Sequence, residues 1–228
     1  MTRAVFFDVD FTLIYPGPTF QGKGYRAFCA AYGVDVDAGA FDRAVAAASS
    51  LLDASGGIYD PRVFIEYTRR IIEAMGGRGP GVDSAARDIY DQWAACHHFS
   101  LYDDVLDVLR QLHASGLKIG LISNTQRCLM SFQRHFDLQG LFAVTISSSD
   151  HGYMKPHPSI FQAALREAGT SAQEALMVGD SLAHDVEGAR RLGMRAVLLS
   201  RSGQSAGCPA DVPVIRTLRE LPDLLRMQ

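Results

Sequence analysis

Two aspartates lie two positions apart at the end of a short apolar run near the start of the chain. The run Ala4-Val5-Phe6-Phe7 leads directly into Asp8, Val9 and Asp10. Residues two apart on a strand share a face, so both carboxylates are expected to point together beyond the sheet edge. Such a pair repels unless a cation or a shared proton intervenes, and Mg²⁺ is commonly bound by one or two carboxylates. An acidic strand end that only caps the next turn is the alternative.

Groups suited to binding an oxyanion follow later apolar runs. Ser123 and Asn124 end one such run, and Lys155 precedes Pro156 at a predicted helix start. Phosphoryl transfer concentrates negative charge on the equatorial oxygens, so its site needs a cation and hydroxyl or amide donors around the nucleophile. The alternatives are a solvated Lys155 and a Ser123 that caps a strand end, whereas Thr12 and Asn124 are expected to brace turns through hydrogen bonds.

The elements that must position these residues form a regular alternation. Apolar runs of strand length separated by patterns of helical period are typical of a parallel sheet covered on both faces. Such a sheet binds ligands beyond the carboxyl ends of its strands. Strands are predicted at 4–7, 118–123, 142–146, 175–179 and 195–199, and helices at 103–114, 159–168 and 184–192.

The segment between the first strand and the helix near Asp103 has a different pattern. It shows helical periodicities and almost no strand-like run, with helices predicted over 40–52 and 83–95 and an apolar stripe formed by Phe64, Tyr67, Ile71 and Met75. We therefore predict an α/β core made of residues 1–15 and 99–228, with residues 16–98 inserted as a small helical domain. Between Ser123 and Lys155 there is room for one helix and one strand.

Four short motifs, taken in order, resemble the haloacid dehalogenase-like hydrolase superfamily. They are Asp8-x-Asp10-x-Thr12, Ser123-Asn124, Lys155-Pro156, and Gly179-Asp180-Ser181 with Asp185. The resemblance extends from Val5 to about Ala196, apart from the helical insertion. It implies a Rossmann-like parallel core, with the inserted helices forming a cap that closes over the substrate and contacts its leaving group.

The resemblance also implies a role for each motif residue in hydrolysis of a phosphate monoester. Asp8 attacks phosphorus and becomes phosphorylated, and Asp10 protonates the leaving oxygen before it activates water as a general base. Ser123 and Lys155 hold the phosphoryl oxygens. The rest of the predicted catalytic set is Thr12 and Asn124.

A Mg²⁺ site follows from the same resemblance. Asp8, the backbone carbonyl of Asp10, and Asp180 are the implied ligands. Asp185 is expected to orient a metal-bound water or Lys155.

Three other functions fit parts of the same motif set. A phosphomutase similar to β-phosphoglucomutase would return the phosphoryl group to a bound sugar, whereas a non-catalytic phosphate-binding module would use the same residues without turnover. The superfamily's dehalogenases lack a carboxylic acid at the position of Asp10, so that residue favours a phosphatase. Phe11 departs from the pattern, because many relatives carry glycine there.

Composition favours a small-molecule partner. The net charge of −3 provides no basic surface for nucleic acid or an anionic membrane. No apolar stretch approaches the roughly 20 residues that cross a bilayer, and the four cysteines form no CxxC pair that would indicate zinc. We expect a cytoplasmic enzyme, either a monomer or a homodimer, that acts on a small phosphorylated metabolite.

Overall fold

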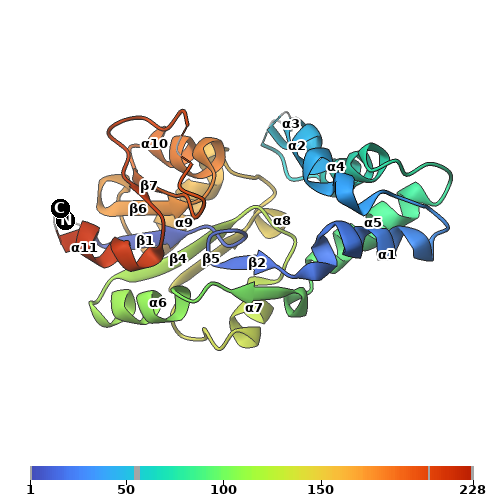
Figure 1. Cartoon of the computed structure of the whole chain (residues 1–228). Coiled ribbons are helices and arrows are strands. Elements are labelled where there is room, and N and C mark those ends of the chain that lie inside the picture. The colour runs from blue at the N-terminus through green and yellow to red at the C-terminus, as the bar shows by residue number, and fades with distance from the viewer. Residues whose placement is uncertain (1, 54–56, 205, 227–228) are drawn as a thin grey trace. The chain divides into compact units, whose positions relative to one another are not determined.

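A computed structural model describes residues 2–53, 57–204 and 206–226 (Figure 1). Met1 and residues 227–228, the outer limits of the predicted core, lie outside the described residues. The chain divides into two compact units, one made of the residues up to Tyr15 and from Leu101 onward, the other of Pro16–Ser100. Among the described residues, no helix has the length and apolar character needed to cross a membrane.

The first unit is built on a six-stranded sheet with the order β5-β4-β1-β6-β7-β8. All of its pairings are parallel, so the predicted α/β class with a parallel sheet is confirmed. The strands are β1 (Ala4–Phe7), β4 (Lys118–Ser123), β5 (Val144–Ser147), β6 (Ala175–Gly179), β7 (Arg195–Leu199) and β8 (Val214–Ile215).

Strand β1 shows why these apolar runs become central strands. All four of its residues are buried, and side chains alternate between the two faces of a sheet. Ala4 and Phe6 pack in a cluster with Met177 and Phe161, on the face covered by α9 (Pro158–Ala168). The opposite face is covered by α6 (Val105–Ala114), and α11 (Leu221–Arg226) packs against α6 (Figure 1).

The strand order places a change of direction at β1. The chain runs from β1 to β4 and β5 on one side, then returns to β6, β7 and β8 on the other. Phe7 is in register with Leu121 of β4 and Val178 of β6. Asp8 therefore leaves the sheet level with the ends of both neighbours, at a switch point where open parallel sheets bind their ligands.

Three predicted elements of this unit differ in detail. The strand expected at 142–146 is Val144–Ser147, and besides α7 (Leu129–His135) a four-residue helix α8 (Ser148–His151) lies before Lys155. The helix expected at 184–192 begins as a π-helix, η5 (Leu182–Glu187), and ends as α10 (Gly188–Arg190). Short 3₁₀ segments are η4 (Ala172–Glu174) and η6 (Leu218–Glu220).

The second unit is helical, as predicted for the insertion. Its helices are α1 (Gly22–Ala31), α2 (Phe41–Ala48), α3 (Ser50–Asp53), α4 (Pro61–Ala74) and α5 (Val82–Trp93), with 3₁₀ turns η1 (Pro18–Phe20), η2 (Ala38–Ala40) and η3 (Cys96–His98). Helix α4 packs against α2 and α5. The prediction of a single helix over 40–52 was wrong, because this segment forms two helices, α2 and α3. At the connections between the units, β2 (Ile14–Pro16) and β3 (Phe99–Leu101) form a two-stranded sheet.

Candidate active site

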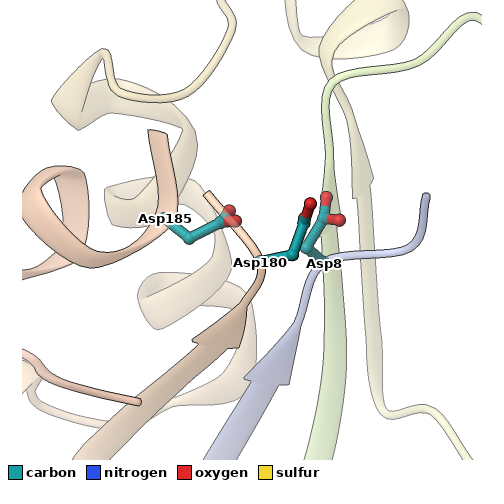
Figure 2. Close-up of side chains that lie close together, drawn as sticks. All are labelled: Asp8, Asp180 and Asp185. Carbon is teal, nitrogen blue, oxygen red and sulfur yellow. The ribbon is translucent and has the colours of Figure 1, made fainter. Parts of the chain in front are cut away.

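Three aspartates from two neighbouring strand ends converge at the switch point. Asp8 follows β1, Asp180 follows β6, and Asp185 lies on the π-helix η5. Each offers one carboxylate oxygen, and these atoms all lie within 4.8 Å of one another (Figure 2). Asp8 and Asp185 are buried, whereas Asp180 is open to solvent.

A buried lysine neutralises part of this negative charge. The Lys155 side chain is 2% exposed, and its Nζ donates hydrogen bonds of 2.6 Å to Oδ1 of Asp8 and Oδ1 of Asp185. Burial disfavours the ammonium form, but attraction to the Asp185 and Asp8 carboxylates outweighs burial and raises the pKa of Lys155. The alternative of a solvated surface lysine is therefore wrong.

Asn124 fixes the backbone that carries this lysine. Its amide Nδ2 donates to the carbonyl oxygen of Lys155 at 2.9 Å, and the backbone N–H of Lys155 donates to Oδ1 of Asn124 at 2.7 Å. Asn124 directly follows β4, so the reciprocal pair ties the segment containing Lys155 to the end of that strand. The predicted role of Asn124 as a hydrogen-bonding brace agrees with this geometry.

The π-helix brings Asp185 back towards the sheet. The backbone N–H of Ser181 donates to Oδ2 of Asp185 at 3.0 Å, while the other carboxylate oxygen accepts from Lys155. Gly179 makes room for this arrangement, because a Cβ on that residue would lie 2.2 Å from Oδ2 of Asp185. The glycine of the Gly179-Asp180-Ser181 motif is thus required by the approach of a carboxylate.

Ser123 and Thr12 complete the inner surface of the site. Ser123 ends β4 and is 1% exposed, and its hydroxyl has no hydrogen-bond partner among the residues that the structure describes. It does not cap the strand end, so a hydroxyl remains for a ligand oxygen. Thr12 is fully buried, and its Oγ1 donates to Oδ1 of Asp180 at 3.4 Å, consistent with the predicted bracing role.

The crowded carboxylates are shifted away from their usual acidity. Burial raises the pKa of Asp8, and the neighbouring Asp185 and Asp10 add to the rise against the opposing effect of Lys155. Desolvation of its carboxylate by the surrounding protein, together with the negative charges of Asp8 and Asp185, likewise raises the pKa of Asp180. A single lysine therefore does not compensate the cluster, and a further cation would relieve the remaining repulsion.

The carboxylate of Asp10 does not join the cluster, but forms an ion pair with Arg127. Nη1 of Arg127 lies 2.9 Å from Oδ1 and 3.2 Å from Oδ2 of Asp10. The Arg127 side chain is completely buried and the Asp10 side chain is 16% exposed. The sequence interpretation missed Arg127, and its only signal was a charged residue in the loop after the strand that ends at Ser123.

A second missed arginine supports the turn after β1. Arg201 pairs through both terminal nitrogens with Asp104 at 3.0 Å and donates to the carbonyl oxygen of Thr12 at 2.8 Å. Its guanidinium also lies 3.5 Å from the centre of the Tyr102 ring. This residue therefore links the loop after β7 to the backbone of the first motif.

Comparison with known proteins establishes the family. Residues 2–193 match the family described as haloacid dehalogenase-like hydrolase, and this region carries all four motifs. The chain belongs to the haloacid dehalogenase-like hydrolase family. The resemblance inferred from the motifs, and with it the expectation of a hydrolase, is confirmed.

Relatives of this haloacid dehalogenase-like hydrolase include curated proteins of similar length. It is 30% identical to ribulose-1,5-bisphosphate 5-phosphatase of Halopiger xanaduensis, over 99% of this chain and 100% of that one. It is 32% identical to haloacid dehalogenase-like hydrolase domain-containing protein 3 of Danio rerio, but the match covers only 64% of this chain and 61% of that relative's length.

Two solved structures of the family resemble the whole chain. The crystal structure of a haloacid dehalogenase-like phosphatase from Thermococcus onnurineus is 26% identical, with a TM-score of 0.68 and coverage of 99% of this chain and 98% of that one. A 2-haloacid dehalogenase from Pseudomonas syringae is 25% identical, with a TM-score of 0.67 and coverage of 100% and 99%. Phosphatases and dehalogenases are thus both among the similar structures, and residues of the site must distinguish them.

Proposed function

We propose that this hydrolase is a Mg²⁺-dependent phosphatase that acts on a small phosphorylated metabolite through a phosphorylated Asp8. The observation that carries the proposal is the environment of Asp8, which lies against Lys155 and a carboxylate cluster, beside the strand that ends in the unbonded hydroxyl of Ser123. A nucleophile, a cation and an oxyanion donor are the parts that phosphoryl transfer requires.

The residues present fit a divalent metal ion. Asp8, Asp180 and Asp185 place carboxylate oxygens within 4.8 Å of one another, and Mg²⁺ prefers oxygen ligands of this kind. We assign Asp8, Asp180 and the backbone carbonyl of Asp10 as ligands. The ion would neutralise negative charge on the phosphoryl oxygens. Asp185 has the role of holding Lys155, whose Nζ donates a hydrogen bond of 2.6 Å to its carboxylate.

The proposed reaction runs in two steps on residues of this chain. A carboxylate oxygen of Asp8 attacks phosphorus while the bond from phosphorus to the ester oxygen breaks, and Asp10 gives its proton to the departing oxygen. Water then transfers a proton to Asp10 and attacks phosphorus, so that the bond to Asp8 breaks and phosphate leaves. The second step restores both the free Asp8 carboxylate and the protonated Asp10. Lys155 and Ser123 bind the phosphoryl oxygens in both steps.

Asp10 favours phosphatase over dehalogenase chemistry. Departure of a halide requires no proton donor, whereas departure of an alkoxide does. The full-length relative named as a sugar bisphosphate phosphatase points the same way. A phosphomutase is the second candidate, and it differs in returning the phosphoryl group to a bound sugar. The helical unit, Pro16–Ser100, is assigned as the cap that would exclude bulk water and contact the leaving group.

Phosphate release from a panel of phosphorylated metabolites and from 4-nitrophenyl phosphate tests this proposal. We expect release that requires Mg²⁺, stops with EDTA and is absent from Asp8→Asn. Intact mass measured after rapid acid quenching should show one added phosphoryl group on the wild type and none on Asp8→Asn. Isomerisation of a sugar phosphate without phosphate release would identify a mutase instead, and turnover by Asp8→Asn at the wild-type rate would rule out the covalent route.

Metal binding has a separate readout that does not depend on activity. Mg²⁺ should raise the unfolding temperature of the wild type, because a ligand that binds only the folded state stabilises it. The gain is about 1.4 kcal/mol when free Mg²⁺ is ten times its dissociation constant. Asp180→Asn should show little or no shift at the same concentration. An equal shift in both proteins would place the ion elsewhere.

A further inference from the structure

We propose that Arg127 is a positioning residue for the acid–base step. It holds the side chain of Asp10 in the orientation from which Asp10 protonates the leaving group and accepts a proton from the attacking water. The inference rests on the proposed phosphatase function. It assigns Arg127 no contact with the substrate.

The geometry of the pair fits this role. One guanidinium nitrogen of Arg127 reaches both carboxylate oxygens of Asp10, at 2.9 and 3.2 Å. Arg127 is fully buried and Asp10 retains 16% exposure. The arginine is therefore closed off from solvent, whereas part of the Asp10 side chain stays accessible to a reacting group.

Arg127 can restrain Asp10 because its own loop is held firmly. The backbone N–H of Arg127 donates to Oγ1 of Thr125 at 3.0 Å. The carbonyl oxygen of Thr125 in turn accepts from Oγ of Ser148 and from the backbone N–H of Ser149, each at 3.3 Å. Thr125 is itself buried. A guanidinium on this loop is pre-oriented, which is the condition for positioning another side chain.

The backbone of Asp10 is restrained separately from its side chain. Asp10 forms a bridge with Ile14, and the next residue, Phe11, donates its N–H to the carbonyl oxygen of Ile14 at 2.7 Å. These bonds set the position of the Asp10 α-carbon, and Arg127 sets the direction of its carboxylate. Nucleophile and acid–base residue are thus held by different cations, Asp8 by Lys155 and Asp10 by Arg127.

Both cations depend on one short segment after β4. Asn124 binds the backbone of Lys155 through the reciprocal pair, and Arg127 follows three residues later on the same loop. The loop therefore positions both the nucleophile, Asp8, and the general acid–base residue, Asp10. Arg127→Met should disturb only the second of these, because Asn124 and Lys155 remain in place.

A comparison of leaving groups tests the inference on the full-length chain with Mg²⁺. An alkyl phosphate needs its departing oxygen protonated, whereas 4-nitrophenolate leaves without a proton. Because kcat/KM reports the first chemical step, Arg127→Met should lower kcat/KM for an alkyl phosphate by about 10- to 100-fold, part of the 10²–10⁴ typical of acid–base catalysis. The value for 4-nitrophenyl phosphate should fall by less than about threefold. Arg127→Lys should recover part of the alkyl phosphate activity. The matched control is Arg134→Met, which makes the same substitution at an exposed arginine.

The outcomes separate the inference from the function on which it rests. Equal loss for both leaving groups in a folded Arg127→Met protein, or no loss for either, would overturn the positioning role. Should Arg127→Met fail to fold, Arg127→Lys carries the same comparison, since it keeps the charge but not the planar fork. A wild type that releases no phosphate from either ester contradicts the phosphatase proposal itself. An Asp10→Asn, Arg127→Met double variant should lose no more alkyl phosphate activity than Asp10→Asn alone.

Discussion

The Nζ atom of Lys155 lies 2.6 Å from Oδ1 of Asp8, although 147 positions separate the two residues in the chain. The same nitrogen binds Asp185 at 2.6 Å. Two carboxylates buried in the core of the first unit are thus neutralised in part by one cation. This relationship makes Lys155 important to stability as well as to the proposed reaction.

Replacement of this cation by an apolar side chain of similar length should be strongly destabilising. Lys155→Met leaves the Asp8 and Asp185 carboxylates buried without their partner, and removal of one member of a buried ion pair typically costs about 3–5 kcal/mol. We expect a lower free energy of unfolding in urea without metal, and no phosphatase activity. Unchanged stability would show that water or another group compensates both carboxylates.

The contact between Gly179 and Asp185 predicts a steric effect at one position. Gly179→Ala introduces a Cβ 2.2 Å from Oδ2 of Asp185, so the carboxylate must move and its bonds to Ser181 and Lys155 weaken. Overpacking of this kind costs about 1–3 kcal/mol. Urea unfolding of the wild type, Gly179→Ala, Asp185→Gly and the double variant Gly179→Ala, Asp185→Gly measures this cost, because Asp185→Gly removes the Oδ2, Cγ and Cβ atoms that lie 2.2, 2.3 and 2.7 Å from the new Cβ. Equal penalties in both backgrounds would contradict the steric explanation.

Stability at low pH should report on Asp104. Burial disfavours its carboxylate, but hydrogen bonds from Arg201, Thr217 and the Leu218 backbone outweigh burial and lower the pKa of Asp104. A lowered folded-state pKa stabilises the protein above the unfolded value of about 3.9, and the gain is lost as the pH falls through the folded value. The difference in unfolding free energy between wild type and Asp104→Asn should stay constant from pH 7 to about 5 and shrink below about pH 4.

An exposed aspartate provides the control for this measurement. Asp211 also pairs with an arginine, Arg190, but its side chain is 68% exposed. Asp211→Asn should change stability much less than Asp104→Asn at pH 7. If the two variants behave alike at every pH, the buried network around Asp104 does not contribute as described.

Phe11 occupies a backbone conformation that favours glycine. Its φ is +63°, in the left-handed region, which costs an L-residue roughly 1–2 kcal/mol. Phe11→Gly relieves this strain and Phe11→Ala does not, while both remove the ring. We expect Phe11→Gly to be more stable than Phe11→Ala by about 1 kcal/mol in thermal unfolding. A reversed order would show that the backbone is not strained at this residue.

Much of the candidate site could be predicted because strand ends of a parallel sheet meet at one edge. Asp8, Ser123 and Asp180 each follow or end a buried apolar run, and the register of β1 with β4 and β6 brings those ends level. Lys155 was predictable from its place in the motif order. Its burial was not, since it depends on a pairing with Asn124 across 31 residues.

The parts that sequence reasoning missed depend on contacts between distant segments. Arg127 is a charged residue in a loop, and such residues are usually solvated, yet here Asp10 from another strand end pairs with it. The apolar residues of 182–187 are compatible with an ordinary helix, and the π-helix arises where Asp185 must reach both Ser181 and Lys155. Apolar residues spaced at the period of an α-helix do not indicate that one side chain in the segment must form these hydrogen bonds.

The two hydrogen bonds between Asn124 and the backbone of Lys155 present the same donor and acceptor as a peptide group of an adjacent strand. One side chain thus pairs with the backbone of Lys155 in the manner of a neighbouring strand and holds the lysine close to the end of β4. Changes in the length of the exposed turn around Gly140 can then be absorbed before β5 begins, and the cation beside Asp8 keeps its place.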